Sequence, residues 1–145
     1  MKKFLCDFEP SLLKAVETEF PGLKKTQGCF FHFRQALKRN VGKRNLLSKL
    51  KEDRSFRKSF DCLSALAFVP ENDVKMLFDK LIQQDFFHPD LKDYAKTYFL
   101  TTWIQGENGT RADYKLSDWN CFQRWELGKA LFLARKFKSP ICIFL

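Results

Sequence analysis

The stretch Phe33-Arg34-Gln35-Ala36-Leu37-Lys38-Arg39-Asn40-Val41 shows most clearly what kind of fold this chain forms. Its apolar residues return every three to four positions, at Phe33, Leu37 and Val41. This spacing is the period of one face of an α-helix, so residues 33–41 predict an amphipathic helix. We expect Gly42 to end it, because glycine weakens helices.

Similar apolar stripes continue toward the C-terminus. Pro70 is expected to end the stripe at residues 56–67, and Pro89 is expected to begin the helix that contains the stripe at 91–99. A polar, glycine-containing loop is expected at 105–113, before a short segment with two tryptophans. The further stripes span residues 46–50, 56–67, 74–82 and 91–99.

The first 32 residues read differently, as strand, helix, strand. Residues 4–6 form a short apolar run that stops at Asp7, residues 9–20 have helical spacing, and residues 26–31 look like a second strand. This order is typical of an α/β fold. The chain is therefore expected to be an α/β fragment followed by a mostly helical part, predominantly α overall.

Composition narrows the class of protein. The 145 residues include 17 phenylalanines and carry a formal net charge of +9, which indicates one packed domain with a polyanion as a natural partner. The five cysteines are scattered and odd in number, so no disulfide framework is expected. No signal peptide or membrane-spanning run is visible, and we expect a reducing compartment, nucleus or cytosol, and no membrane partner.

A basic stretch between residues 24 and 58 is the strongest functional signal. Only two acidic residues, Glu52 and Asp53, oppose its many cations. Arg34 and Lys38 are four residues apart and so share a helical face, which can follow a phosphate backbone without reading bases. The alternative is an ordinary solvated helix surface. The candidate nucleic-acid-binding residues are Lys24, Lys25, Arg34, Lys38, Arg39, Lys43 and Arg44.

Other polar residues each allow two interpretations. Asp7, at a strand end, is placed to hold a metal ion or to cap the helix that follows, and a two-metal site needs at least two more acids. Cys29 and His32 form a Cys-x-x-His pair of the type zinc takes, but structural zinc needs four ligands. A buried thiol with a hydrogen-bonded histidine is the favoured alternative. His88, before Pro89, is expected to lie in a helix cap.

The large aromatic residues also allow two interpretations. Side chains of this kind can stack on nucleic-acid bases. Their helical spacing favours a place in the hydrophobic core instead. The residues concerned are Tyr98, Trp103, Trp119 and Trp125.

The order of several short motifs resembles the Mutator-like element (MULE) transposase family, over about residues 1 to 125. Each motif is weak alone, and their common order carries the resemblance. The matching pieces are Cys6-Asp7-Phe8-Glu9, Phe20-Pro21, residues 28–36 (GCFFHFRQA), residues 65–70 (ALAFVP) with Val74, Tyr98-Phe99 with Thr102-Trp103-Ile104, and Trp119-Asn120.

The resemblance implies a ribonuclease-H-like core of the DDE type, which uses three acidic residues and Mg²⁺ or Mn²⁺ for DNA strand cleavage and transfer. Asp7 matches the second acid and would be a metal ligand. Cys29 and His32 match the family's Cys-x-x-His element, where a helical insertion begins. By this resemblance, residues 1–32 are a partial core, 33–128 the insertion, and 129–145 lie outside the pattern.

The departures from the family pattern shape the functional expectation. The first acid is expected upstream of this chain, and the third, expected in an Arg-Thr-Asn-Asn stretch followed by Glu, is not found after Trp119-Asn120. We therefore expect a catalytically incomplete transposase fragment that binds no metal ion alone and retains DNA-backbone binding. The alternative is a non-catalytic helical module that binds DNA or protein.

The fragment interpretation carries expectations about partners and location. DNA is the expected polyanion, and the exposed flanks of a partial core would favour a second copy or the missing transposase segments as protein partners. Poor stability or self-association is expected when the chain is expressed alone. The expected location is the nucleus, or the cytoplasm without import.

Overall fold

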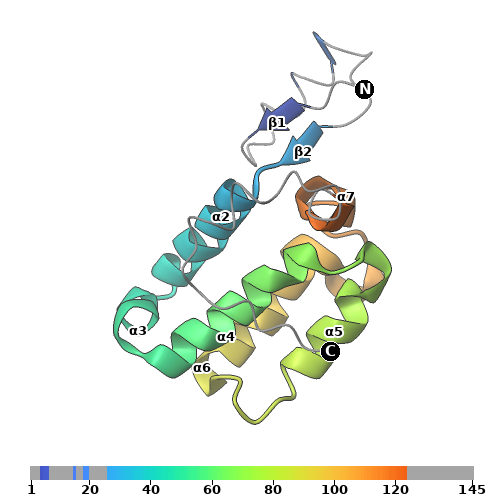
Figure 1. Ribbon diagram of the computed structural model, residues 1–145. Helices are drawn as coiled ribbons and strands as arrows, with labels where there is room; N and C mark the ends of the chain where they lie inside the picture. Colours follow the sequence, from blue (N-terminus) through green and yellow to red (C-terminus); the bar gives the residue numbers. More distant parts are fainter. Residues whose placement is uncertain (1–3, 7–14, 16–17, 20–25, 124–145) are drawn as a thin grey trace.

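The structure is a computed structural model that describes residues 4–6, 15, 18–19 and 26–123 (Figure 1). Most of these residues are helical, which confirms the expectation of a predominantly α protein. No helix among them is long and apolar enough to cross a bilayer. The main elements are β1 (Phe4–Cys6), β2 (Thr26–Gly28), α2 (Phe30–Lys43), α3 (Leu47–Glu52), α4 (Arg54–Ala65), α5 (Val74–Leu81), α6 (Pro89–Tyr94), the π-helix η3 (Ala95–Ile104) and α7 (Leu116–Trp119).

Two short parallel strands lie at one end of the helical body (Figure 1). Cys6 of β1 is in register with Gly28 of β2. The sequence interpretation that extended the second strand to residue 31 is wrong, because β2 ends at Gly28 and α2 begins at Phe30. The helix is favoured over a longer strand because it places Phe30 and Phe33 on one buried face.

The end of α2 also differs from the expectation. The helix passes through Gly42, and Asn45, with φ 58°, adopts the left-handed conformation just beyond it. Asn45 N–H donates to Gly42 O at 3.0 Å and Leu46 N–H to Val41 O at 3.1 Å. These two bonds form a Schellman cap, so the asparagine and not the glycine marks the end of the helix.

Helix α4 runs through the middle of the body, between α2 and α5 (Figure 1). Asp53 caps its N-terminus by accepting hydrogen bonds from Ser55 N (2.8 Å) and Phe56 N (3.1 Å). The stripe expected from residue 56 is confirmed, since Phe56 and Phe60 are buried. Pro70 follows the short 3₁₀ turn η1 (Leu66–Phe68) that ends this helical run.

Helix α6, which follows α5, begins at the cap that the sequence predicted. His88 is the N-cap of α6, and its side chain accepts a hydrogen bond from Asp90 N–H, with Pro89 in the first helical position. The chain then continues directly into η3, where Gln105 N–H bonds to Leu100 O, five residues back. This wider winding is rare in proteins, and it buries Phe99.

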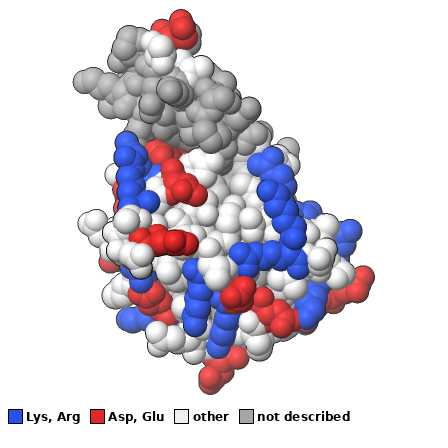
Figure 2. All heavy atoms as spheres, turned by 180° about the vertical axis from the view of Figure 1, so that it is seen from behind, with Lys and Arg blue, Asp and Glu red and all other residues white. Residues whose placement is uncertain are grey.

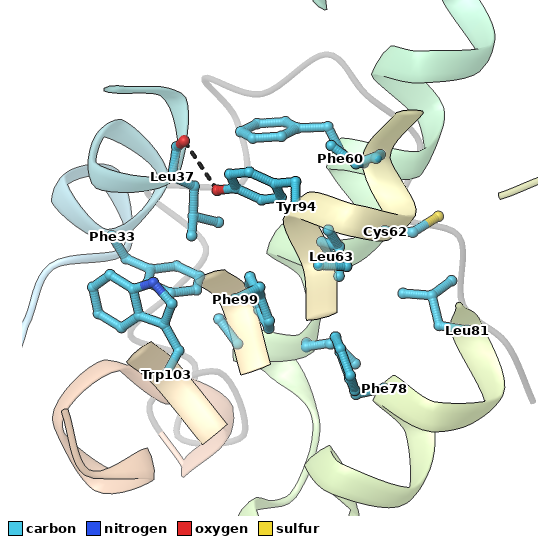
Figure 3. Packing of buried hydrophobic residues seen from close by; sticks show 14 of the residues in the cluster. Phe33, Leu37, Phe60, Cys62, Leu63, Phe78, Leu81, Tyr94, Phe99 and Trp103 are labelled. Carbon is cyan, nitrogen blue, oxygen red and sulfur yellow. Dashed lines mark hydrogen bonds between the residues drawn. The ribbon is translucent and has the colours of Figure 1, made fainter. Parts of the chain in front are cut away.

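Aromatic side chains fill the core (Figure 3). Phe33, Phe99 and Trp103 lie together, and the Tyr94 hydroxyl donates to Leu37 O at 3.0 Å. Trp103 and Trp119 are 1% and 0% exposed, so the core interpretation of these two is confirmed and base stacking by them is wrong. Tyr98 is half-buried, and Trp125 lies outside the described residues.

Several motifs that are far apart in the sequence meet in this core. Asn120 Nδ2 donates to Val69 O at 2.7 Å, and Trp119 Nε1 donates to Trp103 O at 2.8 Å. The Phe33 ring stacks on Trp119, with centroids 4.7 Å apart. Residues from four of the quoted motifs therefore pack together in the core.

Candidate nucleic-acid interface

The exposed side of α2 is basic and carries no acidic residue. Lys38, Arg39 and Lys43 are exposed, and no carboxylate of the described residues forms an ion pair with any of them. We call these three residues the α2 cation set. Figure 2 shows Lys and Arg side chains along both sides of one face of the molecule, with both charges mixed in its lower part. The α2 cation set is suited to contact with a polyanion.

Two other cations of the predicted set are held within the fold. Arg34 forms an ion pair with Asp61 on α4, and its guanidinium lies 5.2 Å from the centroid of a phenylalanine ring, Phe60. Arg44 Nη1 lies 3.0 Å from Asp93 Oδ2, and its other nitrogen donates to Thr97 Oγ1 at 2.8 Å. Arg34 therefore connects α2 to α4, and Arg44, just after α2, connects the end of this helix to α6 and η3.

Lys49, on α3, is also partly neutralised. Lys49 forms an ion pair with Asp90, and this hydrogen bond lowers the pKa of the Asp90 carboxyl. The backbone N–H of Phe56 lowers the pKa of Asp53 in the same way, and His88 Nε2 lies 3.4 Å from Asp53 Oδ2. Both carboxylates are charged at neutral pH, so they reduce the positive potential here.

An open groove of about 560 Å³ runs along α2 beside the cations. Phe31 lies on its wall and is 46% exposed, although it is a large apolar residue. A Cβ added at Gly42 would meet nothing within 4 Å, so the groove is open there. The lining residues are Phe31, Arg34, Gln35, Lys38, Arg39, Gly42 and Leu47.

Replacing Gly42 by alanine is expected to stabilise the domain by about 0.5–1 kcal/mol, because alanine loses less backbone entropy in a helix. The space around Gly42 accepts the methyl group, and its φ is not in the left-handed region. Urea denaturation followed by circular dichroism measures the change. A loss of stability would show that the groove closes on Gly42 in solution.

The Cys-x-x-His pair lies at the start of α2. Cys29 is the N-cap residue, half-buried with a free thiol, and its side chain makes no capping hydrogen bond. His32 Nδ1 is buried without a hydrogen-bond partner, so the expectation of a hydrogen-bonded histidine is wrong for this atom. The described residues contain no group of three or more metal-ligating side chains.

The remaining predicted site residues cannot be placed. Asp7, Lys24 and Lys25 lie outside the described residues.

The sequence interpretation missed Phe31 as a site residue, because it assigned this residue to a strand. Once α2 begins at Phe30, however, Phe31 falls outside the buried stripe that contains Phe33, and this offset was a readable signal of exposure.

Comparison of the chain with protein-family models, curated proteins and solved structures finds no match.

Proposed function

We propose that this chain is a fragment of a MULE-type DNA transposase whose helical part binds the nucleic-acid backbone through α2. The observation that carries the binding proposal is the α2 cation set, three exposed cations on a helix without acids. Phosphates that contact such residues release condensed counterions, which favours association without sequence preference.

The transposase part of the proposal is supported by the motif order. The quoted motifs supply neighbouring core residues, among them Phe33, Trp103 and Trp119, as expected if they belong to one domain. Within this sequence only Asp7 matches one of the family's three acids. We therefore propose binding without strand transfer.

Neutralising one member of the α2 cation set should weaken binding in a salt-dependent way. For Lys38→Gln, the slope of log K against log salt for duplex DNA is expected to fall in magnitude by about 0.9, because one phosphate contact is lost. Fluorescence anisotropy with a labelled 20-base-pair duplex at several salt concentrations measures this slope.

The matched control is Lys80→Gln, which removes the same charge from an exposed position on α5. It should leave the slope unchanged. Equal effects of both variants would show that only net charge matters and would contradict a site on α2. Metal-dependent DNA cleavage that is abolished by Asp7→Ala would contradict the proposed absence of catalysis.

A non-catalytic module that binds DNA or another protein is the second candidate, favoured by the exposed aromatic residue within the groove. Phe31 is 46% exposed next to cations, whereas most large apolar residues are covered. Both candidates predict DNA binding that survives Asp7→Ala.

A further inference from the structure

We propose that the α2 groove binds an unpaired nucleotide segment, with a base stacked on Phe31 and phosphates at Lys38 and Arg39. This inference rests on the proposed function and narrows its ligand from nucleic acid in general to single strands. It starts from the layout of the groove, where aromatic, cationic and open positions follow one another along α2.

Helical geometry sets the order of these positions. Phe31, Gln35, Lys38 and Gly42 are spaced by four, three and four residues, so they lie along one face of α2. Phe31 and Lys38 are two turns apart, about 10 Å along the helix axis. Leu47 of α3 lines the groove as well. An apolar surface is therefore followed by cations and then by open space.

Charge complementarity identifies the occupant as an anion. Lys38 and Arg39 are exposed without an ion-pair partner among the described carboxylates, and the groove lining contains no acidic residue. Phe31 adds an exposed aromatic ring, which can stack on a base but makes no ion pair with a phosphate. Single-stranded nucleic acids present both features together, because their phosphates alternate with bases free to stack on aromatic side chains.

A duplex does not offer the same contact. Its bases are paired and stacked on each other, and a ring enters between them only by unstacking a step, which costs a few kcal/mol. The cations would still contact a duplex backbone. The structure therefore predicts two separable contributions, one from charge shared by both ligands and one from Phe31 for single strands alone.

The test compares binding of a labelled 15-nucleotide oligo-dT and of a 15-base-pair duplex to the full chain. Phe31→Leu is expected to weaken oligo-dT binding about tenfold, in line with the usual loss of one stacked base, and to leave duplex binding unchanged. Phe31→Tyr keeps a ring and should retain the wild-type affinity. Because Phe31 is exposed, these variants should fold, which circular dichroism can verify.

Met76→Leu serves as the matched surface control, since Met76 is 48% exposed on α5. It should change neither affinity. An equal loss for both ligands with Phe31→Leu, or no loss for either, would overturn the inference but leave backbone binding intact. Absence of salt-dependent binding to both ligands would refute the proposed function itself. Binding of poly-glutamate as tight as that of oligo-dT, and insensitive to Phe31→Leu, would overturn the inference in favour of an acidic peptide.

Discussion

Replacing Trp119 by alanine is expected to destabilise the domain by roughly 3–5 kcal/mol, the usual cost of removing a buried tryptophan or phenylalanine side chain. Trp119 is fully buried, stacks on Phe33 at an interplanar angle of 11°, and meets Trp103 edge-on with centroids 6.4 Å apart. Its indole nitrogen also donates to Trp103 O. The variant leaves a cavity at the centre of the core and removes this hydrogen bond to Trp103 O.

Urea denaturation monitored by circular dichroism measures this loss. Trp119→Phe keeps an aromatic ring and should lose less stability, because mainly the hydrogen bond and part of the volume are removed. Met76→Ala, at an exposed position, should stay within about 0.5 kcal/mol of the wild type. A cost below about 1 kcal/mol for Trp119→Ala would mean that α7 does not form part of the cooperative core.

Helical periodicity predicted the helical part of the fold because its stripes are regular. Phe33, Leu37 and Val41 are 0% exposed, and nothing in their spacing competes with a helix. The start of α2 was missed because the aromatic run around Phe30 also suits a strand. What decides it is a distant contact, since the Phe30 ring packs 4.7 Å from Phe68.

The binding site was only partly predictable for a similar reason. The sequence identifies every cation, but it does not identify which of them is neutralised by a distant carboxylate. Arg34 finds its partner Asp61 27 residues away, and Arg44 finds Asp93 49 residues away. Same-face spacing joined Arg34 with Lys38 correctly along the helix, yet tertiary packing gives the two side chains different roles.

The motifs that resemble the family support a shared fold more directly than a shared activity. Large aromatic residues of these motifs are buried, among them Phe33, Trp103 and Trp119. Such residues report on packing, so they support a shared fold more directly than a shared chemistry. The chemical part of the resemblance depends on Asp7, which lies outside the described residues.

Neutralising the whole α2 cation set, Lys38→Gln with Arg39→Gln and Lys43→Gln, should lower duplex affinity by about two to three orders of magnitude at about 0.1 M salt. Each phosphate contact adds about 0.9 to the salt slope, so each contributes nearly tenfold between 1 M and 0.1 M salt. The slope of the triple variant should fall by about 2.7. Anisotropy titrations with a 20-base-pair duplex over about 0.05–0.3 M salt measure both quantities.

The informative comparison is Arg34→Gln with Arg44→Gln, which removes one cation from α2 and one from its C-cap. Because Asp61 and Asp93 already face these arginines, phosphate contact there would release fewer counterions, and we expect a loss of less than about tenfold. Stability should fall instead, since Arg34 joins α2 to α4 in a partly buried ion pair. If this paired set lost as much affinity per charge as the α2 cation set, the number of cations would determine binding. A much larger loss per charge for the α2 cation set would show that the pairing of each cation determines binding. It would place the phosphate contacts on the exposed face of α2.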